Sequence, residues 1–270
     1  MEGISSITAI ISYGLGFALY LTELLKGKGR SSLFAHMLTG IAAFFHVFFL
    51  IFWGLRVKAC PLISPVEAIP FVGLVVIATY FYLLARHRMS GLGPHATFLA
   101  FLSLFLSMIL PKAAPSVPGL ASHWLVFHIA VIFLSYGLLA VAFSTATLYI
   151  VQEKLLKAKK LGGVFRKLPP LEELDSVVYR LILLSFPLLT LGLLTGAVWA
   201  RQEWGSFWTW DPKQTWSLAT WVLYTVYLHS RVVMGWRGRK TIFLVLIAFG
   251  ALVFTFLGVN LMKAGSHQFG

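Results

Sequence analysis

The residues most able to bind a ligand gather in one short segment that is rich in tryptophan. Six of the nine tryptophans lie between positions 199 and 221, where the sequence reads WARQEWGSFWTWDPKQTWSLATW. One or two tryptophans here would be explained by the aromatic belt that anchors membrane proteins. Six exceed what anchoring needs, and each aromatic pair contributes about 0.5–1.5 kcal/mol beyond area burial. The segment therefore predicts a platform for a large flat ligand, with Asp211 as the N-cap of the following helix.

Histidines supply a second set of candidate ligands, because imidazole is the commonest metal-binding side chain. A histidine inside a membrane span is costly and usually functional. His46 lies in the apolar run FFHVFF. A buried imidazole is costly without a partner, so its ring nitrogens must bind a metal, another side chain or a partner protein. His128 and His267 flank the tryptophan-rich segment in sequence; the ordinary alternative is two unrelated interface residues. The other five are His229 in YLHSR, His123, which is ambiguous, and His36, His87 and His95, which are expected to be interface residues.

The elements that carry these residues are expected to be membrane-spanning helices. Of the 270 residues, 59% are hydrophobic and 11% are charged, whereas a soluble domain has about 25% charged residues. A span needs about 20 mostly apolar residues. Eight stretches qualify, namely 4–25, 34–55, 66–84, 96–110, 124–151, 177–199, 215–233 and 242–262. The sequence predicts an all-α polytopic bundle of about eight transmembrane helices, with residues 1–270 forming a single integral membrane domain.

The distribution of basic residues predicts how the bundle is oriented. The net charge is +13, which can signal nucleic acid, but the basic residues sit in short runs between apolar stretches, so no nucleic-acid partner is expected. Loops on one side hold 16 Lys and Arg, and loops on the other hold 6. The first side should be cytoplasmic. Both termini and segment 199–221 are then expected to be extracytoplasmic, and the first apolar stretch to be a span rather than a cleaved signal.

The run WGSFWTWDPKQTWSLATWVLYTVYLH, which starts at Trp204, resembles the WWD motif of the cytochrome c assembly family. The resemblance is greatest to its CcsA (ResC) branch, whose pattern is similar to WGxYWxWDPKETW. Phe207 and Gln214 replace Tyr and Glu of that pattern, so a role that needs a carboxylate at 214 is in doubt. Weaker similarities are PLISPVEAI from Pro61 and the ending Gly258–His267.

The resemblance implies a b-type haem as transported substrate, held outside the membrane for attachment to a CxxCH apocytochrome c. His128 and His267 would be its axial ligands, His229 would serve a second haem site within the membrane, and His46 is a further candidate. The segment that covers the macrocycle would include Trp204, Trp208, Trp210, Asp211 and Trp216. Arg201 and Lys213 either pair with the haem propionates or are ordinary loop charges.

The resemblance also implies a CcsB (ResB)-like membrane partner, contact with membrane lipid and a place in the bacterial cytoplasmic membrane. No side chain is expected to act as nucleophile or general base, so the chain would contribute to a haem lyase complex by positioning. The first alternative is a HemX-like membrane regulator of haem biosynthesis. The second is a transporter or channel in which the tryptophans only anchor the bundle. The sequence assigns no role to Glu67 or to Cys60. Because Cys60 is the single cysteine, the chain cannot form an internal disulfide.

Overall fold

The computed structural model describes residues 2–26, 31–57, 65–87, 89–110 and 123–259. These residues form eight long helices and no strand. The helices are α1 (Glu2–Lys26), α2 (Ser31–Val57), α3 (Pro65–His87), α4 (Gly93–Ile109), α5 (His123–Lys157), α6 (Leu171–Trp204), α7 (Pro212–Val232) and α8 (Arg239–Val253). Short 3-10 turns, η1 (Ser90–Leu92) and η2 (Phe165–Lys167), precede α4 and α6, and α8 continues into a π-helical turn, η3 (Phe254–Gly258).

The all-helical membrane fold is confirmed, with one difference. Seven of the helices in the described part of the chain are long and apolar enough to cross a membrane, and α7 is not among them. Its sequence, PKQTWSLATWVLYTVYLHSRV, mixes apolar residues with polar and basic ones. Two helices are longer than the predicted spans: α5 continues to Lys157, and α6 begins earlier, at Leu171. Hydropathy marks only the part of a helix that is apolar enough to lie in lipid.

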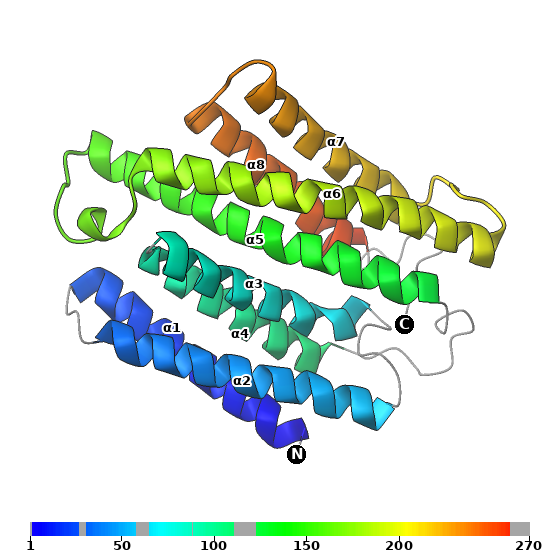
Figure 1. Cartoon of the computed structure of the whole chain (residues 1–270), viewed down its shortest axis with the longest axis horizontal. Helices are drawn as coiled ribbons and strands as arrows, with labels where there is room; N and C mark the ends of the chain where they lie inside the picture. The colour runs from blue at the N-terminus through cyan, green and yellow to red at the C-terminus, as the bar shows by residue number, and fades with distance from the viewer. Residues whose placement is uncertain (1, 27–30, 58–64, 88, 111–122, 260–270) are drawn as a thin grey trace.

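The helices alternate in direction, so the bundle has two distinct ends (Figure 1). The C-terminal ends of α2, α4, α6 and α8 lie at one end, called here the tryptophan end. The C-terminal ends of α1, α3, α5 and α7 lie at the other, called here the basic end, where Lys and Arg gather around η2 and the α7–α8 turn. The start of α5, the end of α6, the start of α7 and η3 therefore meet at the tryptophan end.

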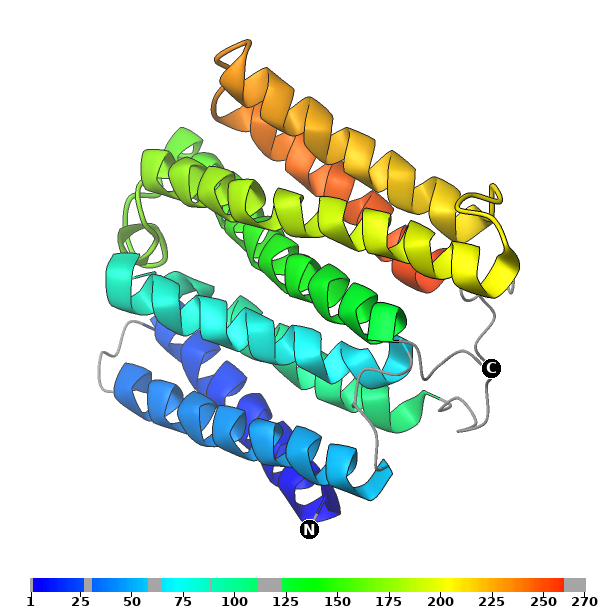
Figure 2. The ribbon, with the colours of Figure 1, turned by 45° about the vertical axis from the view of Figure 1, so that its right-hand side comes forward.

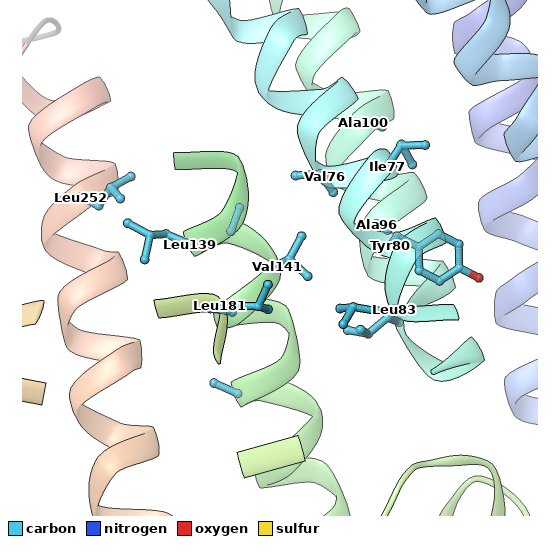
Figure 3. Close-up of a cluster of buried hydrophobic side chains, with 14 of the residues drawn as sticks. Val76, Ile77, Tyr80, Leu83, Ala96, Ala100, Leu139, Val141, Leu181 and Leu252 are labelled. Carbon is cyan, nitrogen blue, oxygen red and sulfur yellow. The ribbon is translucent and has the colours of Figure 1, made fainter. Parts of the chain in front are cut away.

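Helix α5 is the central element that joins the two halves of the bundle. It packs against α3 on one side and against α6 and α8 on the other, while α1 contacts α2 and α4 (Figure 2). Buried Val76 and Tyr80 of α3, Val141 of α5 and Leu181 of α6 belong to one apolar cluster (Figure 3), and the Tyr80 hydroxyl donates to the Tyr20 hydroxyl of α1 at 3.1 Å. Small residues let the backbones approach closely, as at Gly137, where a Cβ would meet Val75 Cγ1 at 2.5 Å.

Candidate functional site

A cavity at the tryptophan end is enclosed by α5, α6, α7 and η3. Its volume is about 100 Å³. Most of its wall is apolar or aromatic, and a few polar side chains face it, which is the usual make-up of a small-molecule site. The lining residues are Leu125, His128, Ile129, Ile132, Phe133, Tyr136, Leu193, Gly196, Ala197, Trp199, Trp208, Lys213, Gln214, Ser217, Thr255 and Phe256.

His128 enters this cavity from the second turn of α5 and is held against α6. Its Nδ1 lies 2.7 Å from the carbonyl oxygen of Gly192. A carbonyl can only accept a hydrogen bond, so Nδ1 carries the proton and the lone pair resides on Nε2. A Cβ at Gly196 would lie 2.8 Å from His128 Cε1, so the ring needs the glycine beside it. This tautomer, fixed by a backbone carbonyl, is the one that histidines use when Nε2 binds a metal.

The tryptophan-rich segment is a helix end, a loop and a helix start, so it is not a continuous interfacial platform. Gly205 ends α6 in the left-handed conformation, with φ of 75°. Asp211 starts α7, and its side chain accepts a hydrogen bond from the Lys213 backbone N–H, which confirms the predicted N-cap. Gln214 reaches back, and its Oε1 accepts from the Thr209 backbone N–H at 2.9 Å. This acceptor needs no charge, so Gln serves here as Glu would.

These breaks in the helix divide the tryptophans among different surroundings. Trp199 and Trp208 line the cavity. Trp204 packs edge-on against Trp199, with ring centroids 5.1 Å apart. Trp216 packs against Phe254 of η3, and Trp221 donates from Nε1 to Thr190 Oγ1 at 2.9 Å.

Trp210 is the most exposed of the set, at 73%, and lies perpendicular to Trp208. Its φ of 56° is rare for a bulky residue, and such strain is commonly found at functional sites.

Lys213, in the first turn of α7, brings a charge to the cavity wall. Burial lowers the pKa of its ammonium group to about 8, although the neighbouring Asp211 carboxylate acts in the opposite direction. Arg201 lies elsewhere: it is exposed, and its guanidinium carbon sits 4.8 Å above the centre of the Phe207 ring. Arg201 and Lys213, for which the sequence offered the same two alternatives, therefore have different surroundings. Of the two, only Lys213 faces the cavity.

The other predicted histidines do not meet at this cavity. His267 and Cys60 lie outside the described residues, as do the side chains of Glu67 and His123. His229 lies near the other end of α7, about 24 Å from Lys213 at 1.5 Å per residue, and its side chain is exposed. His46 is fully buried between α1 and α3, where its Nδ1 lies 3.3 Å from the Tyr13 hydroxyl. His87 is 3.6 Å from Glu173, and His36 packs against Tyr20.

Several residues of the cavity were not predicted from the sequence. Gly192 and Gly196 hold His128, and Tyr136 and Phe256 complete the wall. A signal for the two glycines was present, because a pair of small residues four positions apart marks close helix contact in membranes. Tyr136 and Phe256 carry no comparable signal, since aromatic residues are common in every span of this chain.

Comparisons with known proteins identify the family. Residues 62–267 match the family described as cytochrome C assembly protein. The cytochrome c biogenesis protein CcsA of Chlamydomonas reinhardtii is 39% identical over 199 residues, covering 73% of this chain and 55% of that protein. CcsA of Trieres chinensis is 34% identical over 242 residues, covering 78% of each, and CcsA of Gloeobacter violaceus is 35% identical over 238 residues, covering 69% and 70%.

A solved structure shares the fold. The cytochrome c haem lyase CcmF superposes with a TM-score of 0.67 and 21% identity, covering 95% of this chain and 46% of that one. This chain thus spans about half the length of CcmF and of the Chlamydomonas relative. The family match and the similarity to these relatives show that the chain belongs to the cytochrome c assembly protein family, as a CcsA-type member.

Proposed function

We propose that this chain presents haem at the His128 cavity for attachment to apocytochrome c. The observation that carries the proposal is the hydrogen bond from His128 Nδ1 to the Gly192 carbonyl, because it orients an Nε2 lone pair suited to iron. The aromatic residues that line the same cavity, Trp208 among them, also suit a flat macrocycle. Membership of a cytochrome c assembly family supports haem as the substrate.

The second axial ligand in this proposal is His267. It follows Gly258, the last residue of η3, by nine positions, and Thr255 and Phe256 of η3 line the cavity. Trp204 would support the cavity wall through Trp199, and Trp216 would brace η3 through Phe254. Trp210, exposed beside Trp208, would extend the aromatic surface outward, and Asp211 would serve as the cap that holds the loop.

The chemistry required of this chain is positioning. Each thiol of a CxxCH apocytochrome would add across a haem vinyl group, forming one C–S and one C–H bond with no leaving group. The histidine of CxxCH would then replace one axial ligand. Holding the macrocycle still converts the encounter into a nearly intramolecular reaction, which can supply several kcal/mol of the barrier.

A second haem site is proposed at His229, on the export path. Its side chain is exposed on α7, so a second iron ligand would come from another molecule, for which we propose a CcsB (ResB)-like partner. His46 is buried beneath Tyr13, and a haem there would require α1 and α2 to separate. We also propose that the basic end faces the cytoplasm of a bacterium and the tryptophan end faces outward, because Lys and Arg gather at the former.

The test is an absorption spectrum of the protein purified with a coexpressed CcsB-like partner. We expect the His128→Ala/His267→Ala double variant to lose the bands of bis-histidine haem at the outer site. His87→Ala, at the basic end, is the matched control and should keep them. Unchanged haem content and spectra in the double variant would contradict the ligand assignment.

A further inference from the structure

A second cavity lies at the basic end, between the end of α3 and the connector from α5 to α6. Its volume is about 460 Å³, and small-molecule sites have volumes of about 300–1,000 Å³. Three segments meet there, namely the last turn of α3, η2 with the residues after it, and the first turn of α6. The lining residues are Arg86, His87, Lys167, Leu168, Pro169 and Glu173.

Contacts within the chain hold the connector side of this cavity in place. Leu168 is buried against Gly91 of η1, where an added Cβ would lie 2.8 Å from Leu168 Cδ2. The Lys167 ammonium donates to the carbonyl oxygens of Glu23 and Leu24, near the end of α1. The backbone of the connector is thereby fixed against α1 and η1, and Lys167 keeps its place on the cavity wall.

The wall carries the side chains that bind phosphate in proteins. Arginine does so through a planar fork of N–H groups and lysine as a point charge, and Arg86 and Lys167 both line the cavity. Glu173 lies 3.6 Å from the His87 ring, and the Glu23 carboxylate is close enough to Lys167 for their charges to interact. Neither cation has to be unpaired to bind an anion, because a guanidinium has five N–H donors and an ammonium three.

The surface that leads to the cavity along α3 suits an acyl chain. Helix α3 is apolar and long enough to cross a membrane. Ala78, Tyr82 and Arg86 follow one another at intervals of four residues, so they lie on one face of α3, and all three are exposed. Tyrosine is typical of the level where hydrocarbon meets the lipid headgroups. A lipid whose chain lies along this face has its headgroup beside Arg86.

We propose that the cavity lined by Arg86 and Lys167 binds the headgroup of an anionic phospholipid. Basic pockets between membrane helices are a recurrent site for such headgroups. Arg86 and Lys167 bind the phosphate diester, while the Glu173 carboxylate repels the phosphate and accepts a hydrogen bond from a headgroup hydroxyl. Because α3 belongs to one half of the bundle and α6 to the other, the bound lipid joins the two halves at the basic end.

Native mass spectrometry of the delipidated protein in detergent tests this proposal with four probes. They are dioleoylphosphatidylglycerol, which is anionic, dioleoylphosphatidylcholine, which is zwitterionic, glycerophosphoglycerol, which is the first headgroup without its acyl chains, and inorganic phosphate. We expect the first phosphatidylglycerol to bind about tenfold more tightly than phosphatidylcholine, since each cation near the membrane surface contributes about 1 kcal/mol toward an anionic lipid. The two probes without acyl chains should bind more weakly than either lipid.

Variants assign the preference to the cavity. Arg86→Gln/Lys167→Met should bind the two lipids equally, and Arg86→Lys/Lys167→Arg should keep much of the preference. Lys154→Met/Lys157→Met is the matched control, because it removes two exposed cations at the same end of the bundle, outside the cavity, and it should keep the preference. If Arg86→Gln/Lys167→Met does not fold, Arg86→Gln alone makes the comparison, since Arg86 is exposed.

Three results would overturn the proposal. Equal affinity of the wild type for the two lipids does so without any variant. An equal loss of preference in the control variant would show a general attraction of the basic end for anionic lipid. Binding of inorganic phosphate or glycerophosphoglycerol as tight as that of phosphatidylglycerol would show a site for free anions in place of a lipid site.

Discussion

His128 Nδ1 donates a hydrogen bond to the Gly192 carbonyl oxygen across 2.7 Å, so a residue of α5 takes its orientation from the backbone of α6. Gly196, one turn further along α6, makes room for the same ring. The two contacts fix both the proton position and the direction of Nε2. The orientation of His128, the proposed haem ligand, is therefore set by two glycines of α6.

Gly196→Ala should displace His128. The new Cβ would lie 2.8 Å from Cε1 and 2.9 Å from Nδ1, closer than carbon atoms tolerate, so the ring must move and its bond to Gly192 must lengthen. We expect most of the bis-histidine haem signal of the purified complex to be lost. Gly250→Ala in α8 is the control, because a Cβ there meets nothing within 4 Å. Equal spectra for the two variants would show that His128 does not need this orientation.

Gln214 is expected to hold the Trp208–Trp210 loop through its carbonyl oxygen. This oxygen accepts from the backbone N–H of Thr209 at 2.9 Å and from its hydroxyl at 3.1 Å. Gln214→Glu keeps an acceptor in place and should leave cytochrome c production in cells near wild type. Gln214→Ala removes it, costs about 1 kcal/mol of local stability and should lower the yield of c-type haem. A Glu variant as defective as the Ala variant would refute this role.

The buried pair Asp175–Arg231 is expected to anchor α7 at the basic end. Arg231 Nη2 lies 2.6 Å from Asp175 Oδ2, and the two side chains are 9% and 10% exposed. Asp175 also accepts from the Gly238 backbone N–H, in the turn before α8. Removing one partner leaves an uncompensated buried charge, so Arg231→Met should destabilise the fold by about 3–5 kcal/mol.

Thermal unfolding in detergent, followed by size-exclusion chromatography, measures this effect. Lys157→Met is the matched control, because the Lys157–Glu153 pair has a 59% exposed lysine and such pairs contribute about 0–1 kcal/mol. The double variant Asp175→Leu/Arg231→Met should recover part of the loss, since it leaves no lone charge. Similar unfolding temperatures for Arg231→Met and Lys157→Met would exclude an anchoring role for the pair.

The sequence predicted the features that depend on local pattern. Apolar stretches of span length predicted the helices, and Asp211-Pro212 predicted the start of α7, because capping is decided within a few residues. The sequence did not predict that the tryptophans of segment 199–221 would lie in different surroundings. Their surroundings depend on the left-handed turn at Gly205 and on which neighbouring helix each ring meets, and these are properties of packing. His46 illustrates the same limit, since its partner Tyr13 lies 33 residues away on another helix.

If Lys213 pairs with a haem propionate, which is one of the two alternatives for this residue, haem affinity should fall as pH rises above about 8. Burial lowers the pKa of Lys213 to about 8 in the empty cavity, with Asp211 opposing that shift and His128 and Tyr136 also facing the cavity. A bound carboxylate would raise this pKa. The contribution of Lys213 to binding is therefore fully present below about 8 and is lost as pH rises through the higher pKa of the bound state.

Titrations of the purified complex with haem between pH 7 and about 10 would measure this loss. Haem dimethyl ester has no carboxylate, so its affinity should lack the alkaline decline, and Lys213→Met should remove the decline for haem. Lys213→Arg should shift it beyond the range, because a guanidinium keeps its charge throughout. An alkaline decline that is the same for haem and its ester would assign the effect to another group and leave Lys213 without a role in carboxylate binding.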